Sequence, residues 1–247
     1  MSSLNDRLRR ATARLLPAKP VKMTPERALA SLTFDDFPRS AWTAGGPILA
    51  RHGVRGTYYA AGRYCGASED GLAYYDKDDL MAVHAAGHEV GCHSWGHVQG
   101  HRERTSTLAE DADRNAAFVS GLLGDAPMVS FAYPYGELSA RTKRVFAPRF
   151  ATCRGVHGGL NVGVTDLADL RAEPIERRSW SAEKVEAVVA QAAERKAWLI
   201  FFTHDVSDDP SPYGCTPAML EHALTVLRAA DVDVLPVKAA LARATFG

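Results

Sequence analysis

The feature that most constrains the fold is a regular alternation of short apolar segments with longer segments of helical period. From residue 29 onward, runs rich in β-branched and aromatic residues are followed by stretches with apolar residues every three or four positions. Most of the short runs are apolar almost throughout, which is typical of strands in a parallel sheet that helices cover. The pattern therefore predicts repeated βα units.

The predicted strands are 29–34, 56–61, 88–93, 129–134, 149–154, 170–175, 198–204 and 232–237. The predicted helices are 45–53, 76–87, 105–124, 138–146, 181–196 and 216–230. Seven or eight such units in 247 residues favour a closed or nearly closed α/β barrel in a single domain. An open doubly wound sheet would usually show a glycine-rich phosphate turn, and the sequence has neither GxGxxG nor a P-loop.

The balance of charges argues against nucleic acid as a partner. The chain carries 29 basic and 29 acidic residues, so no global field favours nucleic acid. Residues 1–28 form a predicted basic arm or helix ahead of the barrel domain at 29–247, and residues 4–16 fit an amphipathic helix. We favour a solvated helix or frayed terminus there over a peripheral membrane anchor. Because no signal peptide or transmembrane run is recognisable, we expect a cytoplasmic protein; the oligomeric state is left open.

Residues suited to chemistry follow the ends of four predicted strands. They are Asp35 and Asp36, His93 and His97, Tyr135, and His204 with Asp205. Each alone has a structural explanation, such as a turn cap, a hydrogen-bonded core histidine or packing. However, the carboxyl ends of barrel strands meet on one face, where active sites are built. Convergence of these residues on that face favours a functional site.

Four histidines, His88, His93, His97 and His101, lie within fifteen positions. A helix would align the last three, but four glycines interrupt the segment, and Ser94 stands where a helical zinc protease has glutamate. We predict instead that a strand ends near His93 and that the next turn brings His97 beside it. His88 would then lie about 16 Å away along the strand, so we assign it and His101 structural or secondary roles.

Two neutral imidazoles and one carboxylate, with positions left open for water and substrate, suit a catalytic divalent ion such as Zn²⁺. Either Asp35 or Asp36 can complete such a set with His93 and His97. Successive residues at a strand end point in different directions. One aspartate should therefore bind the metal while its neighbour handles protons.

Four motifs occur in a fixed order: "TFDD" at 33–36, "HSWGH" at 93–97, "FAYPYG" at 131–136 and "LIFFTH" at 199–204. With this ordered set the chain resembles the polysaccharide deacetylase superfamily, carbohydrate esterase family four, over roughly residues 29–240. The resemblance implies a distorted (β/α) barrel with seven or eight parallel strands. It further implies that Asp35 is the catalytic base and His204 the general acid. The implied metal ligands are Asp36, His93 and His97.

Three more residues are candidates for substrate contacts. By the resemblance, Tyr135 matches the position whose backbone N–H helps to hold the oxyanion, and Leu199 lies in the motif that contributes to the acetyl-methyl pocket. Trp95 either stacks on a sugar ring or packs in the core. The loop 207–217 beside His204 either shapes substrate selection or leads into the next helix.

The sequence departs from the family pattern twice. Ala132 stands where members commonly carry an arginine that pairs with the catalytic aspartate, and Arg154 or Arg171 could reach the same carboxylate. The family's aspartate that orients the catalytic histidine has only poor matches. They are Asp166, Asp169 and the segment 177–180.

The resemblance implies a metal-dependent hydrolase that removes acetyl groups, above all N-acetyl groups, from an amino-sugar polysaccharide or oligosaccharide through metal-activated water. A second hypothesis is hydrolysis of a small non-sugar amide or cyclic imide or ureide on the same barrel. A third is a non-catalytic carbohydrate-binding relative, motivated by Ala132.

Overall fold

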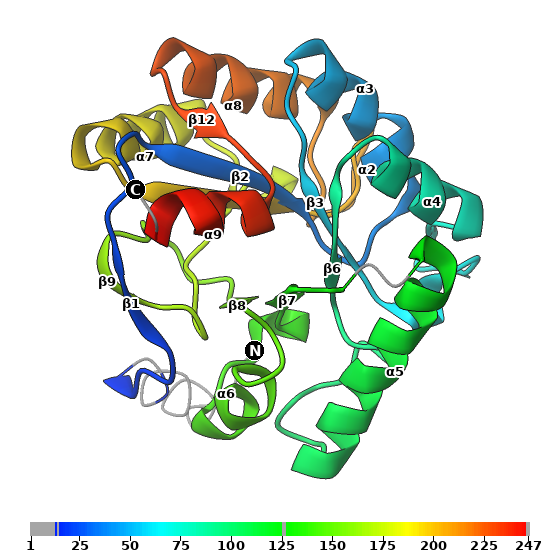
Figure 1. Ribbon diagram of the computed structural model, residues 1–247. Coiled ribbons are helices and arrows are strands. Elements are labelled where there is room, and N and C mark those ends of the chain that lie inside the picture. Colours follow the sequence, from blue (N-terminus) through cyan, green and yellow to red (C-terminus); the bar gives the residue numbers. More distant parts are fainter. Residues whose placement is uncertain (1–12, 14, 125–126, 246–247) are drawn as a thin grey trace.

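The computed structural model describes residues 13, 15–124 and 127–245, and these residues build an α/β fold around one strongly curved sheet (Figure 1). Its strand order is β10–β11–β2–β3–β6–β7–β8, with β12 beside the start of β2, and all pairs are parallel. The strands are β2 (Leu29–Phe34), β3 (Thr57–Ala60), β6 (Glu89–Cys92), β7 (Ser130–Ala132), β8 (Thr152–Arg154), β10 (Glu173–Pro174), β11 (Trp198–Thr203) and β12 (Asp233–Val234). The prediction of a single-domain distorted barrel with seven or eight parallel strands is confirmed.

Helices pack around the outside of this sheet (Figure 1). They are α2 (Arg39–Thr43), α3 (Gly45–Arg51), α4 (Lys77–Ala85), α5 (Thr105–Leu123), α6 (Ala140–Phe146), α7 (Ala182–Arg195) and α8 (Pro217–Ala229). Side chains of Asp76, Ser139, Ser181 and Thr216 accept hydrogen bonds from the first turns of α4, α6, α7 and α8. All but α2 lie within predicted ranges. That helix has only five residues, too few to show a helical period.

The predicted strand 232–237 is wrong beyond Val234, because α9 (Val237–Thr245) begins where the strand was expected to end. In Figure 1 this helix lies across the opening of the curved sheet. Its buried residues belong to the same apolar cluster as Leu29 and Trp198 of the sheet. A short, mostly apolar run such as 232–237 does not fix where a strand ends and a helix begins, and here packing against the sheet decides it.

Two small antiparallel pairs complete the described structure. The strand β1 (Pro20–Met23) pairs with β9 (Gly163–Asp166), and β4 (Ser68–Glu69) pairs with β5 (Leu72–Ala73). Most of the predicted amphipathic helix at 4–16 lies outside the described residues. Within the described part of the chain, no helix has the length and apolarity that a bilayer span requires.

The alternation of side chains along β2 places Asp35, the first of the two aspartates, on the inner face of the barrel. Ala30, Leu32 and Phe34 belong to the apolar cluster under the outer helices. The alternate residues Ser31 and Thr33 are buried on the other face, where Ser31 Oγ accepts a hydrogen bond from Trp198 Nε1 at 3.0 Å. Asp35 continues this inner series one step beyond the strand.

Lys143 on α6 fastens the N-terminal segment to the barrel, and it yields a stability prediction. Its ammonium is buried and donates to Ala13 O at 2.7 Å, to Leu16 O at 3.3 Å and to Asp166 Oδ2 at 2.7 Å. Lys143→Met should lower the free energy of unfolding by about 2–3 kcal/mol, because Asp166 loses its cation while remaining mostly buried. Urea denaturation measures this change.

The matched control is Lys184→Met, at an exposed position of α7. It should change the free energy of unfolding by less than about 0.5 kcal/mol. Equal urea midpoints for Lys143→Met and wild type would show that the buried ammonium does not hold the segment.

Candidate active site

Asp36, His93 and His97 converge at the carboxyl ends of β2 and β6. Asp36 Oδ1 lies 3.3 Å from His93 Nε2 and 3.1 Å from His97 Nε2. The ligand-type atoms of these three residues all lie within 4.8 Å of one another. The structure thus brings together the three side chains that the sequence nominated as metal ligands.

The donor set fits a divalent cation. His93 Nδ1 lies 2.8 Å from Ala132 O, and since a carbonyl oxygen only accepts, Nδ1 carries the proton. In the neutral imidazole, Nε2 therefore presents a lone pair toward Asp36. Asp36 Oδ1 is buried and has no hydrogen-bond partner among the described residues. A lone pair of His93 Nε2 that faces a carboxylate oxygen in this way suits a cation between them. The bond from the distal nitrogen to a backbone carbonyl is common for metal-binding histidines.

The electrostatics favour the protonation states that such a site needs. Burial raises the pKa of Asp36, but the facing imidazoles of His93, His97 and His204 outweigh burial and hold the pKa of that carboxyl well below its ordinary value. Burial lowers the pKa of His97 to about 4, against the opposing attraction of Asp36. At neutral pH the carboxyl is charged and His97 is neutral, as in a metal ligand set.

Left-handed backbone conformations concentrate at this site. Asp36, Ser94, His97 and Tyr135 have φ values of 61°, 61°, 48° and 58°. A residue with a side chain adopts this region at a cost of about 1–2 kcal/mol. The turn at Asp36 separates its side chain from that of Asp35, and the turns after β6 bring His97 back beside His93, as predicted.

Asp35 is 3% exposed and forms a buried ion pair with Arg154 Nη2. Arg154 ends β8 and is fully buried, with its guanidinium carbon 5.1 Å from the Tyr59 ring centroid and 5.2 Å from that of Phe202. Of the two arginines that the sequence offered in place of Ala132, the structure therefore selects Arg154. Arg171 instead lies near Gly158, toward which its guanidinium donates a long hydrogen bond.

His204 follows β11 and faces the same centre, with Nε2 3.9 Å from Asp36 Oδ2. Its Nδ1 donates to Tyr213 O at 3.2 Å and lies 4.0 Å from Glu176 Oε1. Glu176 is 1% exposed; burial raises its pKa, and the ion pair with Arg178 opposes that rise. Neither Asp166 nor Asp169 takes this place: Asp166 binds Lys143, and Asp169 lies near Lys143 and His157.

Sequence reasoning missed Glu176, although the rule that found the other residues could have found it. Glu176 comes directly after the predicted strand 170–175, as Asp35 comes directly after 29–34. It also missed Tyr64, whose hydroxyl lies 3.3 Å from His97 Nδ1. No motif marked that tyrosine, which reaches the site from the short η1 helix (Gly62–Tyr64).

The remaining candidates are placed differently. Tyr135, in the η2 turn (Pro134–Gly136), is 52% exposed, and its ring centroid lies 4.5 Å from that of His97. Leu199 is not brought to the site. It is the second residue of β11, about 13 Å before the carboxyl end, and it belongs to the cluster under the outer helices. Membership of the motif predicted proximity, but register and side-chain alternation place Leu199 elsewhere.

Trp95 packs against α5. Its ring meets Phe118 edge-on with the centroids 5.3 Å apart, and the Arg114 guanidinium lies 4.0 Å from its centroid. A Cβ on Gly62 would lie 2.2 Å from the ring, so the contact there is close. This placement agrees with core packing rather than with stacking on a sugar.

Neither His88 nor His101 joins the metal cluster. His88 is buried at the start of β6, where its Nδ1 accepts from Gly56 N at 2.9 Å, and burial lowers its pKa to about 4. His101 lies 2.6 Å from Glu137 Oε2 at the surface. Both have the structural or secondary placement that the sequence predicted.

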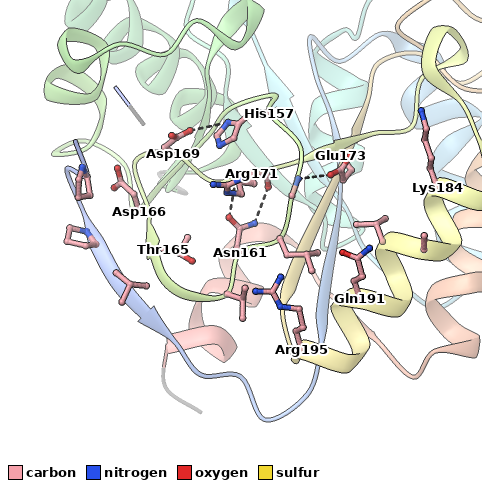
Figure 2. Close-up of a pocket in the computed structure, with 18 residues that line it drawn as sticks. His157, Asn161, Thr165, Asp166, Asp169, Arg171, Glu173, Lys184, Gln191 and Arg195 are labelled. Atoms are coloured by element: carbon pink, nitrogen blue, oxygen red, sulfur yellow. Dashed lines mark hydrogen bonds and ion pairs between the residues drawn. The ribbon is translucent and has the colours of Figure 1, made fainter. Parts of the chain in front are cut away.

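A cavity in the described structure lies apart from the metal cluster. It has a volume of about 820 Å³ and lies between α7 and the segment around β9 (Figure 2). Arg171, Asp166 and Asp169 line it, but the residues of the metal cluster, Asp35 and His204 do not. The candidate active-site residues lie at the carboxyl ends of β2, β6 and β11 instead.

Comparison with known proteins decides the family. The sequence model described as polysaccharide deacetylase matches residues 22–147, just over half of the chain. The chain belongs to the polysaccharide deacetylase family. The matched region contains Asp35, Asp36 and both histidines of the cluster, whereas Arg154, Glu176 and His204 lie beyond it.

Among curated relatives, the peptidoglycan-N-acetylglucosamine deacetylase PgdA of Listeria monocytogenes is 30% identical over 139 residues, which are 56% of this chain and 27% of that protein. The chain thus spans about a quarter of the length of the curated relatives it matches. Solved structures of other proteins share the fold. A family 4 acetyl xylan esterase from Clostridium thermocellum in complex with a cobalt ion is 20% identical, with a TM-score of 0.61 over 85% of this chain and 89% of that one. A family 4 pseudoenzyme from Bacillus anthracis is 16% identical, with a TM-score of 0.59 over 91% and 69%.

The acceptor cluster generates a test of metal binding. Asp36→Asn should weaken zinc binding at least about 10–100-fold. Loss of a residue that only hydrogen-bonds to a metal ligand already weakens metal binding by that factor, and Asp36→Asn removes the charge of a direct ligand. Competition with a chromophoric chelator measures the affinity. His101→Asn, outside the cluster, should leave it unchanged, and equal zinc affinity in Asp36→Asn and wild type would rule out the cluster.

Proposed function

We propose that this polysaccharide deacetylase family member is a metal-dependent hydrolase that removes N-acetyl groups from an amino-sugar polysaccharide or oligosaccharide. The observation that carries the proposal is the juxtaposition of the cluster of Asp36, His93 and His97 with the buried Asp35–Arg154 pair and with His204. A divalent cation, most simply Zn²⁺, held by the cluster would supply a Lewis acid that polarises a carbonyl group and acidifies water.

Asp35 is the proposed base. Its carboxylate is held by Arg154 at the inner edge of the site, and one of its oxygens is engaged by that guanidinium. The ion pair fixes the carboxylate and compensates its buried charge. From this position Asp35 takes a proton from the water that attacks the acetyl carbon.

His204 is the proposed acid. Its Nδ1–H is fixed by Tyr213 O and lies near the buried carboxyl of Glu176, so Nε2 is the nitrogen turned to the site. In the proposed mechanism, Nε2 of the protonated imidazole donates its proton to the leaving amine. The backbone N–H of Tyr135 is the proposed partner of the oxyanion, as the family resemblance implies.

Two observations weigh against the alternatives. The non-catalytic hypothesis was motivated by Ala132, and Arg154 supplies an arginine to Asp35 from another strand. For a small amide or cyclic imide, an enclosed pocket would be expected. The tyrosines beside the site, Tyr135 and Tyr213, are half-exposed, which suits a ring within a longer chain.

The test is acetate release from acetylated amino-sugar oligomers by the zinc-loaded protein. Asp35→Asn and His204→Gln should each lower kcat at least about 100-fold, the usual contribution of a positioned base or acid. Asp208→Asn, in the exposed part of the neighbouring loop, should match wild type. Cyclic imides and ureides assayed in parallel test the alternative substrate class, and equal rates for Asp35→Asn and wild type would contradict the mechanism.

A further inference from the structure

The wall of the site beside His204 is formed by Tyr213, a residue of the loop 207–217 that matches none of the family motifs. Its side chain is 49% exposed, and its ring centroid lies 5.7 Å from that of His204. Tyr135 packs against His97. Two histidines of the site, His97 and His204, are thus each contacted by a half-exposed tyrosine ring.

Arg178 holds the Tyr213 ring from one side. Its guanidinium carbon lies 4.1 Å from the ring centroid, which is a cation–π contact. Arg178 Nε donates to Glu176 Oε2 at 2.7 Å, and the Arg178 backbone N–H donates to Pro212 O at 3.2 Å. The carboxyl beside His204 and the ring of Tyr213 are therefore fixed by the same arginine.

The loop that presents Tyr213 is itself fixed by a buried carboxylate. Asp205 is 1% exposed and accepts from Ser211 N at 2.8 Å and from Ser211 Oγ at 2.5 Å. A Cβ on Gly214 would lie 2.2 Å from Asp205 Oδ1, so only glycine fits the turn after Tyr213. A ring held in place before binding loses little conformational entropy when a ligand packs on it.

This inference rests on the proposed function. We propose that Tyr213 is a platform for the substrate: the sugar ring that retains the freed amine packs on the Tyr213 ring. Arg178, which contacts the Tyr213 ring, is the positioning residue. His204 donates its proton to that amine, so the sugar lies within reach of His204. Tyr213 offers an exposed aromatic surface beside His204, and an aromatic ring matches the apolar C–H face of a sugar. Trp180 does not compete for this role, because it packs edge-on against His222 of α8 with the centroids 5.8 Å apart.

The experiment compares Tyr213→Ala, Tyr213→Phe and Tyr213→Trp on the same acetylated oligomers. Tyr213→Ala should raise KM about tenfold, equivalent to about 1.4 kcal/mol, with a smaller change in kcat. Tyr213→Phe and Tyr213→Trp should stay within about threefold of wild type, because they keep an aromatic face. Arg178→Met should raise KM in the same direction as Tyr213→Ala.

The matched controls are Trp180→Phe and Arg195→Met, an exposed arginine of α7 that lines the outer cavity in Figure 2. Both should keep the wild-type KM. If Tyr213 only supports the loop and His204, Tyr213→Ala will lower kcat and the melting temperature and leave KM unchanged, and that result overturns the platform.

Calorimetric titration with the deacetylated oligomer separates this inference from the proposed function. If the wild type releases no acetate, the proposed function fails, and the titration alone decides the platform. Weaker binding by Tyr213→Ala but not by Tyr213→Phe supports the platform. Equal binding by all three proteins, or no binding by the wild type, overturns it.

Discussion

The buried ion pair between Asp35 and Arg154 depends on the curvature of the whole sheet. Arg154 ends β8, at one edge, while Asp35 follows β2, four strands away in the pairing order. Two side chains so far apart in a flat sheet meet only because the sheet curls and its inner face closes on itself. Removing a guanidinium and a carboxylate from water costs several kcal/mol per ion, so neither charge is tolerated without the other. The ion pair therefore forms only in the curved sheet, and within it each buried charge requires the other.

The adjacent carboxylates of Asp35 and Asp36 have different charged partners. Asp35 continues the inner series of β2 and receives the arginine, whereas Asp36 adopts a left-handed conformation that turns it toward His93 and His97. The imidazoles lower the pKa of Asp36, and burial keeps His97 neutral. A negative group and two neutral lone-pair donors therefore gather beside a charge pair that is already balanced. This arrangement leaves a net negative centre for a cation.

Much of this arrangement could be predicted from the sequence, because both fold and site follow local periodicity. Apolar strands alternating with helices indicated the parallel barrel, and residues directly after strands indicated the face on which side chains converge. The predictions that failed depend on how the elements pack in three dimensions. Leu199 shares a motif with His204, but strand alternation directs it under the outer helices. The strand predicted at 232–237 ends at Val234, and the helix α9 that follows was not predicted. The choice of Arg154 over Arg171 depends on curvature, which no local pattern encodes.

The central claim is that two imidazoles and one carboxylate bind a divalent cation beside the Asp35–Arg154 pair. X-ray absorption spectroscopy of the zinc-loaded protein tests it most directly. The expected spectrum shows only nitrogen and oxygen ligands at about 2.0–2.2 Å, with the scattering pattern of two imidazoles. In Asp36→Asn and His97→Asn, zinc at one equivalent should lose this signature. A sulfur shell near about 2.3 Å, from any of the four cysteines, or an unchanged spectrum in both variants would contradict the account.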